Sequence, residues 1–274
     1  RAWSRTLGSV FCGNGVTATE NGVVVAATDQ DEDKDEDKST LVYLAAESGE
    51  GWRVPSEKIR AVASEESNVY TAANTEDGLR IRAHAADTGR RRWDATLPNP
   101  DGTRRFGDLH LVAEGSQVYA LVGGTLYAFR SSDGRQLWKL PLYQRSSGDL
   151  YVADGTAYVS WNDSYTRFIV STVRRTSLAA IDTATGRRLW HKRIEALCSF
   201  AAAEGRTVYV DYYRERTLRP NEESLIAFDA RTGRQRWERG IDVGGAVTID
   251  SGILYVPTRD DELEAIDAAT GHGP

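Results

Sequence analysis

The chain has 274 residues, of which 40% are hydrophobic and 27% charged, and its formal net charge is −6. This composition is typical of a globular chain, because no apolar run approaches the roughly 20 residues of a membrane helix. The acidic balance argues against a general nucleic-acid binder. The chain contains no Met, so we expect a processed form or a fragment of a longer protein.

Two kinds of apolar run alternate along the chain. The first kind follows a polar turn, and in chain order its copies are NGVVVAA (21–27), SNVYTAA (67–73), SQVYALV (116–122), GTAYVS (155–160), RTVYVDY (206–212) and GILYVPT (252–258). The second kind ends at a glycine turn and resumes with a Trp, as in IDTATGRRLWHKRI, residues 181–194. Alternation with period two and Gly, Asp and Ser punctuation predict strands throughout, with no amphipathic helix.

The turn glycines reveal an internal repeat. They are Gly49, Gly89, Gly134, Gly186, Gly233 and Gly271, with spacings of 40, 45, 52, 47 and 38 residues. Spacings of this size are typical of propeller blades. The Trp residues that follow the first five turns are Trp52, Trp93, Trp138, Trp190 and Trp237. We therefore predict four short strands in each repeat and a single domain over residues 1–274.

The turns have a consistent chemistry. Asp182 can hydrogen-bond the backbone of the turn that follows it, and Gly186 supplies the positive φ that closes a short hairpin. Asp229 with Gly233 and Asp267 with Gly271 repeat this arrangement. We expect each Trp to pack against the neighbouring sheet and to find an acceptor for its indole N–H.

The two ends of the chain complement each other. The last repeat stops three residues after Gly271, before its Trp strand, whereas the N-terminus begins with RAWSRTL. Trp3 can therefore supply the missing strand, which would close the ring and remove its exposed edges. The sequence predicts an all-β fold: a six-bladed β-propeller of four-stranded antiparallel blades, with the ring closed by the N-terminal strand.

The repeated D-x-x-T-G-x-x-x-W pattern resembles the tryptophan-docking repeat of pyrroloquinoline-quinone-like β-propellers over essentially the whole chain. The resemblance implies three alternatives for function. These are an extracytoplasmic sensor domain like those of bacterial serine/threonine kinases, a scaffold lipoprotein like the propeller of the outer-membrane barrel assembly machinery, and a quinone-dependent dehydrogenase. A membrane tether would lie in a region upstream of this sequence.

The dehydrogenase alternative fits the residues poorly. Those enzymes resemble an eight-bladed ring with adjacent cysteines and a calcium-binding acid cluster, whereas Cys12 and Cys198 are far apart and we expect free thiols. The four histidines form no metal-spaced pair. The acidic run 29–38 fails the EF-hand pattern at Lys34 and Thr40 and is expected to be a solvated insertion. We predict no cofactor, no metal and no catalytic residue.

The longer connections all fall on one predicted face, which makes that face the expected binding surface. They are residues 28–40, 95–108, 139–149, 161–176 and 211–224. Tyr or Trp together with Arg, the residue types enriched at binding hot spots, occur in three of them. The candidate binding residues are Tyr143, Arg145, Trp161, Tyr165, Arg167, Tyr212, Tyr213, Arg214 and Arg216.

We therefore expect a non-catalytic recognition domain of an extracytoplasmic bacterial protein, located in the cell envelope. Its expected partner is a protein segment or an anionic surface ligand. The alternative interpretation of the same residues is that the loops pack on one another and the Arg side chains are only solvated.

Overall fold

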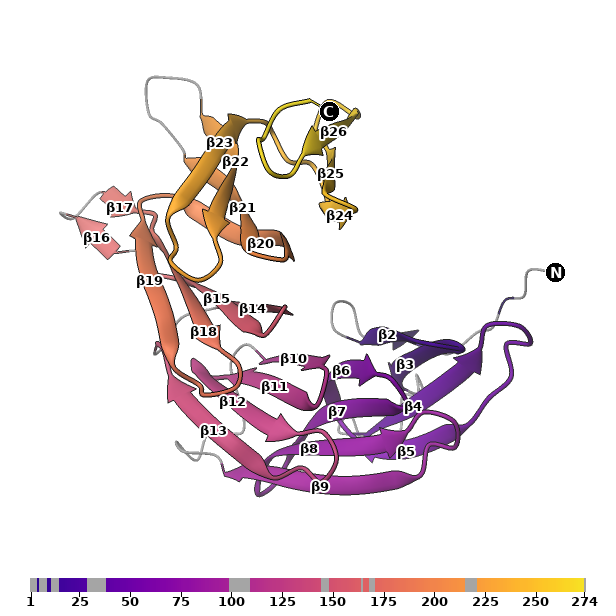
Figure 1. Ribbon diagram of the computed structural model, residues 1–274. Helices are drawn as coiled ribbons and strands as arrows, with labels where there is room; N and C mark the ends of the chain where they lie inside the picture. Colours follow the sequence, from indigo (N-terminus) through magenta and orange to yellow (C-terminus); the bar gives the residue numbers. More distant parts are fainter. Residues whose placement is uncertain are drawn as a thin grey trace. The chain divides into compact units, whose positions relative to one another are not determined.

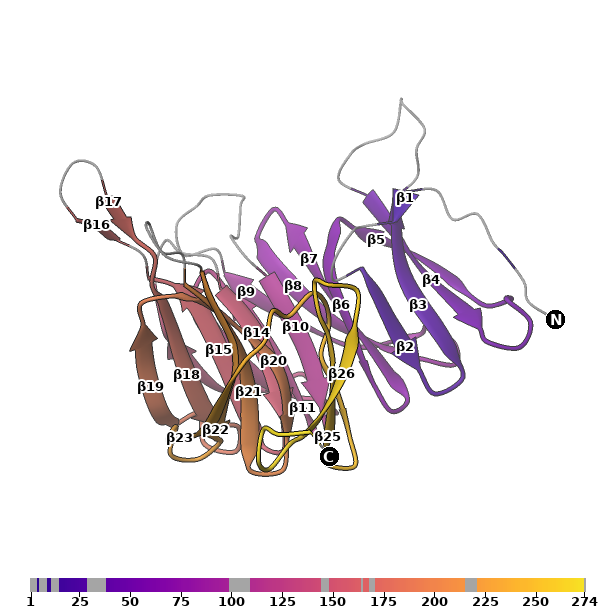
Figure 2. The ribbon, with the colours of Figure 1, turned by 90° about the horizontal axis from the view of Figure 1, so that it is seen from above.

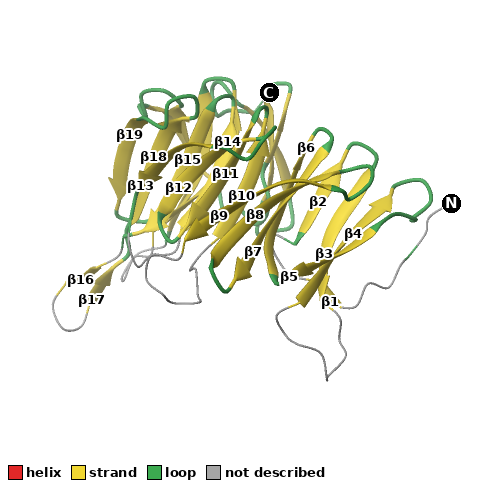
Figure 3. Cartoon of the chain, turned by 90° about the horizontal axis from the view of Figure 1, so that it is seen from below, coloured by secondary structure: helices red, strands yellow, loops and turns green. Residues whose placement is uncertain are grey.

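The computed structural model describes residues 4, 9–10, 15–28, 38–98, 109–143, 148–163, 165–167, 171–214 and 221–273. Regular structure in these ranges consists of strands alone (Figure 3). The same ranges accordingly contain no helix of the length and apolar character needed to cross a membrane. The chain divides into two compact units, Arg1–Arg145 and Ser146–Pro274.

The first unit contains three antiparallel sheets, in which strands adjacent in the chain are hydrogen-bonded neighbours except for β1, which pairs with β3 (Figure 1). The strands are β1 (Ser9–Val10), β2 (Val16–Thr19), β3 (Gly22–Thr28), β4 (Lys38–Ala45) and β5 (Arg53–Glu57) in the first sheet; β6 (Ile59–Glu65), β7 (Asn68–Thr75), β8 (Gly78–Ala85) and β9 (Arg91–Pro98) in the second; and β10 (Leu109–Glu114), β11 (Gln117–Val122), β12 (Thr125–Arg130) and β13 (Gln136–Pro141) in the third. In the first sheet, β1 and β2 pair with successive parts of β3, so together they occupy one strand position.

The second unit also contains three antiparallel sheets. Their strands are β14 (Gly148–Ala153), β15 (Thr156–Asn162), β18 (Thr176–Asp182) and β19 (Arg188–Ile194); β20 (Leu197–Glu204), β21 (Thr207–Arg214), β22 (Glu222–Asp229) and β23 (Gln235–Gly240); and β24 (Thr248–Asp250), β25 (Ile253–Pro257) and β26 (Leu263–Asp267). A two-stranded ribbon of β16 (Tyr165–Arg167) and β17 (Ser171–Val173) is inserted between β15 and β18 and projects from their sheet (Figure 2).

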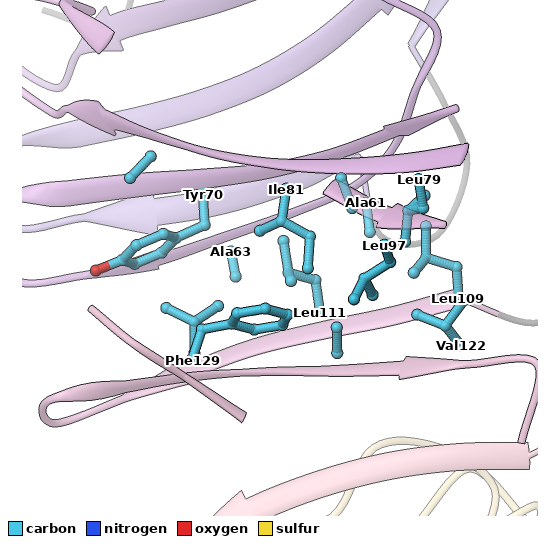
Figure 4. Packing of buried hydrophobic residues seen from close by; sticks show 14 of the residues in the cluster. Ala61, Ala63, Tyr70, Leu79, Ile81, Leu97, Leu109, Leu111, Val122 and Phe129 are labelled. Carbon is cyan, nitrogen blue, oxygen red and sulfur yellow. The ribbon is translucent and has the colours of Figure 1, made fainter. Parts of the chain in front are cut away.

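The hydrophobic core lies between successive sheets. In the first unit, Tyr70, Leu79 and Ile81 of the second sheet pack against Leu111 and Phe129 of the third (Figure 4). Separate clusters join the fourth sheet to the fifth and the fifth to the sixth. In the second to fifth sheets the second strand is buried on both faces over most of its length, as β11 shows, because it is flanked by strands at both edges and packed on both sides. Its apolar and β-branched composition suits that environment.

The repeated turns have the expected geometry. Asp182 Oδ1 accepts hydrogen bonds from the backbone N–H of Thr185 at 2.9 Å and from its hydroxyl at 2.6 Å. Asp229 with Thr232 and Asp267 with Thr270 make the same pair of bonds. Gly233 has a φ of 67°, a left-handed conformation that glycine adopts at little cost. The turn sequence thus fixes the tight turn that follows the third strand of a sheet.

The fourth strand of a sheet, here called the outer strand, contacts the next sheet through the indole of its Trp. The indole N–H of Trp190 donates to the carbonyl oxygen of Ala230 in the next sheet at 2.8 Å. Trp52, Trp93 and Trp237 make the same contact, with Ala86, Ser131 and Ala268. Trp138 lies against Tyr119 of its own sheet, with 6.2 Å between ring centroids. Trp3 lies outside the described residues.

The predicted fold class is confirmed, because the described residues form six antiparallel sheets in chain order and no helix. The last sheet has three strands in the described part. Closure by the N-terminal strand falls on residues outside that part, so it stays a prediction, as does the single domain over residues 1–274. Each expected loop overlaps the end of at least one flanking strand, and two differ most: β21 and β22 extend into 211–224, and the ribbon lies within 161–176.

Candidate binding groove

Five of the nine candidate binding residues have described side chains. Tyr143 belongs to the first unit, and Trp161, Tyr212, Tyr213 and Arg214 belong to the second. Tyr165 and Arg167 lie on β16, of which only the backbone is described, and Arg145 and Arg216 lie outside the described residues. The structure therefore allows the second unit's residues to be placed relative to one another.

Tyr212 and Arg214 come from the same face of β21. Side chains two positions apart on a strand share a face, and this face packs toward the fourth sheet. Tyr212 is buried, at 7% exposure, and the guanidinium of Arg214 lies 5.4 Å from the centre of its ring. Arg214 Nε donates to the carbonyl oxygen of Glu195 at 2.9 Å, and an Arg214 guanidinium nitrogen lies 3.5 Å from a Glu222 carboxylate oxygen. Arg214 thus ties the fifth sheet to the connection that follows β19.

A groove of about 530 Å³ opens between β19 and this face of the fifth sheet. Its lining comprises Lys192, Arg193, Ile194, Tyr212, Arg214, Glu222, Ile226, Phe228, Gln235 and Glu238. Ile226 and Phe228 are buried, so the floor is apolar, whereas charged side chains border it. A volume of this size falls within the range of ligand-binding clefts, about 300–1,000 Å³.

Lys192 extends from β19 over the floor of the groove. Its ammonium lies 5.4 Å from the centre of the Phe228 ring, a distance at which a cation is attracted to an aromatic face. On the opposite wall, the side-chain amide of Gln235 donates to the Glu238 carboxylate at 3.1 Å. Both charge signs are therefore present along the groove, above an apolar floor.

Trp161 lies on the other side of the fourth sheet. It is 7% exposed and stacks on His191, with ring centroids 5.3 Å apart and an interplanar angle of 9°. Burial lowers the pKa of His191, and the neighbouring Arg188 and Arg193 lower it further. Beside this stack, Asp163 Oδ2 lies 3.0 Å from a guanidinium nitrogen of Arg175 and 3.3 Å from Nε of Arg193. The structure therefore separates Trp161 from the groove residues.

The opposite face of the fifth sheet contains carboxylates. Burial raises the pKa of Asp211, with the charge of Asp242 adding to the effect. Burial and a hydrogen bond with Asp242 raise the pKa of Glu223. Arg259 lies 3.6 Å from Glu223 and 3.3 Å from Asp242. No cluster with the arrangement of a metal site occurs among the described residues.

Cys198 is the one cysteine in the described part of the chain. Cys198 is free, and burial raises the pKa of its thiol to about 12, so the thiol stays protonated at neutral pH. Cys12 lies outside the described residues.

Sequence reasoning missed the groove residues outside the loops, above all Lys192, Phe228 and Gln235. A signal for them was present in the repeat. Lys192 lies two positions after Trp190, and so it shares the face with which this Trp contacts the next sheet. Phe228 directly precedes the turn Asp229 of that sheet. The position two residues after a docking Trp therefore predicts a contact with the third strand of the following sheet.

Comparisons with known proteins agree with this architecture. A family model described as the outer membrane protein assembly factor BamB matches residues 1–219 and 221–273. The solved structure of BamB from Moraxella catarrhalis has a TM-score of 0.58 and 16% identity, over 97% of this chain and 77% of that one. The computationally designed protein Ika8 has a TM-score of 0.62 and 16% identity, over 94% and 72%.

An enzyme also shares the fold. Quinohemoprotein alcohol dehydrogenase from Comamonas testosteroni has a TM-score of 0.53 and 16% identity, over 78% of this chain and 42% of that one. Among curated proteins, no sequence match was found. Likeness at these identities shows a common fold, and function must be argued from the site.

Proposed function

The chain belongs to the family of the outer membrane protein assembly factor BamB, and we propose that it is a non-catalytic propeller that binds a segment of a partner protein. The observation that carries this proposal is the groove between β19 and the fifth sheet. Its buried floor of Tyr212, Ile226 and Phe228 can accept apolar side chains, and its charged border can orient a polypeptide. Interfaces of this kind combine an apolar centre with a polar rim.

The family favours a scaffold in envelope assembly over the sensor domain of a kinase, because the family's description is that of an assembly factor. An assembly factor acts on other proteins, which agrees with a groove suited to a polypeptide. An extracytoplasmic location is part of the proposal. Among the candidate residues, Tyr212 and Arg214 line the groove, whereas the buried Trp161 would act by supporting β15.

A site-specific cross-linking experiment tests the binding surface. A photo-reactive amino acid replaces Gln235, which is exposed and lines the groove. The matched control replaces Gln136, which is also exposed and also lies two residues before the Trp of an outer strand, Trp138. In intact cells, we expect a discrete protein adduct at position 235 and none at position 136. Equal labelling at the two positions, or none at either, would contradict the proposal.

Titration with pyrroloquinoline quinone tests the non-catalytic part of the proposal. The purified chain is titrated with and without calcium, and its visible absorption is recorded as isolated. We expect no saturable binding and no quinone band. Stoichiometric binding accompanied by dye-linked dehydrogenase activity would establish an enzyme instead.

A further inference from the structure

The second sheet has a histidine at a core position that is apolar in the other five sheets. His84 lies five residues before the turn glycine, Gly89, and is 2% exposed. The residues at the same distance before the other turn glycines are Leu44, Phe129, Ile181, Phe228 and Ile266. A buried side chain that can take up a proton near neutral pH therefore replaces side chains that cannot.

His84 lies at the contact between the first and second sheets. Its cross-strand neighbour on β7 is Val69, and paired residues of neighbouring strands share a face. Val69 is fully buried and packs in one cluster with Trp52 and Val54 of the first sheet. The imidazole therefore borders an apolar contact, in which a charge without a partner is costly.

The imidazole braces the turn against which Trp52 rests. His84 Nδ1 lies 3.0 Å from the carbonyl oxygen of Gly89, so Nδ1 carries the proton of this bond. Trp52 donates its indole N–H to the carbonyl oxygen of Ala86 in the same turn, and a Cβ added at Gly89 would lie 2.7 Å from its ring. With Ala85, this turn lacks the Asp that organises the turns of the last three sheets, and His84 supplies a side-chain bond in its place.

A charge on His84 would find the neighbouring carboxylates already paired. The charged side chains on this face of the second sheet and opposite it in the first are Arg80, Arg82, Arg91, Asp94 and Glu57. The Arg82 guanidinium lies 3.0 Å from Asp94 and 3.2 Å from Glu57. A guanidinium nitrogen of Arg91 lies 3.2 Å from the second oxygen of Asp94. Three guanidinium groups thus share two carboxylates, and an imidazolium would add a further positive charge.

The folded chain favours the neutral imidazole. Burial lowers the pKa of His84 and the charge of Arg82 lowers it further, whereas the bond to Gly89 and the charge of Asp94 act in the opposite direction with a smaller effect. In the described part of the chain, Gly89 is the one hydrogen-bond partner of the imidazole, whereas an imidazolium has two N–H groups to satisfy. Proton uptake is therefore easier once the contact between the sheets has opened.

We infer that the contact between the first and second sheets opens on acidification, because proton uptake by His84 separates turn 85–90 from Trp52. The neutral imidazole stabilises the contact fully above the ordinary pKa of a histidine, about 6.5. This stabilisation is lost progressively as pH falls from there toward the lower folded-state value. The acid-sensitive contact belongs to the first unit, whereas the groove belongs to the second, so this inference goes beyond the proposed function and does not depend on it.

Hydrogen exchange of the whole chain at pH 7.5 and pH 5.0, corrected for the intrinsic rate at each pH, tests this inference. The probes are the amide of Ala86, which donates to Ser67, and the indole N–H of Trp52. We expect the protection of both to fall about tenfold at pH 5.0, because opening is linked to the uptake of one proton.

The fifth sheet supplies a matched internal control. The amide of Ala230 donates to Arg206, and the indole N–H of Trp190 donates to Ala230, as their counterparts do in the second sheet. Phe228 occupies the position of His84 there. The protection of these two groups should be the same at both pH values.

Two variants assign the response to one side chain. His84→Phe introduces the residue found at this position in the third and fifth sheets, and the protection of Ala86 should then be the same at pH 5.0 and pH 7.5. His272→Gln removes an exposed histidine from the turn of the sixth sheet and should respond to acid as the parent chain does. Because Phe has to fit a site shaped for imidazole, the His84 ring is also titrated by NMR in the parent chain. Its midpoint should lie below about 6.5.

Three results would overturn the inference. The first is equal protection of Ala86 and Trp52 at the two pH values in the parent chain. The second is an equal fall in the fifth sheet, which would mean that acid destabilises the whole chain. The third is an undiminished response in His84→Phe, or a His84 midpoint at or above about 6.5.

Discussion

Trp190 shows how one side chain joins two sheets. It is 9% exposed, its N–H bonds to the carbonyl oxygen of Ala230, and a Cβ added at Gly233 would lie 2.8 Å from its ring. A flat ring and a glycine turn therefore fit each other closely. The same close approach joins Trp52 to Gly89, Trp93 to Gly134 and Trp237 to Gly271. In each case the Trp of one sheet contacts the turn glycine of the next sheet.

Replacing Trp190 with Ala should lower the free energy of unfolding by about 3–5 kcal/mol, the usual cost of removing a buried large aromatic. The loss has two sources, the cavity left between the sheets and the unpaired carbonyl of Ala230. Urea unfolding followed by circular dichroism measures the change. A loss below about 1 kcal/mol would show that the indole is not essential for the contact between the sheets.

Two glycine variants provide an independent check of this contact. Gly233 and Gly205 both have positive φ, 67° and 57°, so Ala is strained at both. Only at Gly233 does the added Cβ meet Trp190; at Gly205 nothing lies within 4 Å. Gly233→Ala should therefore be more destabilising than Gly205→Ala by about 1–3 kcal/mol. In the Trp190→Ala background, this difference should largely disappear.

Asp229 contributes stability that depends on pH. Its hydrogen bond from Arg236, together with those from Thr232, holds the pKa of this carboxyl below its usual range. A lowered folded-state pKa means that the stabilisation is complete above the unfolded pKa, about 3.9, and is lost as pH falls through the folded value. Asp229→Asn should cost about 1–2 kcal/mol at neutral pH and clearly less at about pH 3. An equal cost in urea unfolding at both pH values would contradict this.

At the scale of elements, the fifth sheet has two unlike faces. The face toward the fourth sheet forms the groove, and the face toward the sixth sheet contains Asp211 and Glu223, close to Asp242 and Arg259. Alternation along β21 produces this division, because Tyr212 and Arg214 point one way and Asp211 points the other. One strand thus contributes to the groove and to a carboxylate cluster.

Asp211 should show the opposite pH dependence to Asp229. Burial raises its pKa in the folded chain, so the ionised form is disfavoured there relative to the unfolded chain. This destabilisation is present above the folded-state pKa, and it fades as pH falls through that value toward the unfolded one. Asp211→Asn should therefore raise the free energy of unfolding at neutral pH, and the gain should shrink on acidification. A variant less stable than the parent at pH 7 in urea unfolding would contradict this.

The repeat made the strands, the turns and the docking indoles predictable, because each depends on local chemistry such as the Asp182 turn and the glycine conformation. The groove was not predictable in the same way. Tyr212 and Tyr213 were expected in a loop, yet β21 continues to Arg214, which pairs with Glu222 across the hairpin. Strand length there is decided by cross-strand pairing, the stacking of Trp161 on His191 by contact between strands of one sheet, and burial of Tyr212 by packing between sheets. These are tertiary effects that one sequence does not reveal.

At the scale of the whole molecule, the sixth sheet differs from the others. Leu254, Val256 and Ile266 are buried against the fifth sheet. On its other face, Tyr255 is 39% exposed and Leu263 is 68% exposed. In the described residues, β26 has a strand partner on one edge alone. Every earlier sheet has an outer strand after its glycine turn, whereas the sixth has no such strand in the described residues.

The N-terminal segment is the expected source of that element. Residues 1–8 contain Trp3, and in them Trp3 and Leu7 have the same parity, so on a strand both would point to one face. Addition of this segment to β26 would complete the sheet and satisfy an open edge.

Amide hydrogen exchange can test this pairing in the full chain and in a chain lacking residues 1–8. With the N-terminal strand in place, the amides along the free edge of β26 should exchange slowly, because they donate to a neighbouring strand. Deletion should speed their exchange by about tenfold or more, which corresponds to about 1.4 kcal/mol of local opening free energy. The amides of β22, which is paired on both sides, serve as the internal control and should not change. Unchanged exchange in β26 would mean that another segment, or none, completes the sixth sheet, and the predicted ring closure would then be wrong.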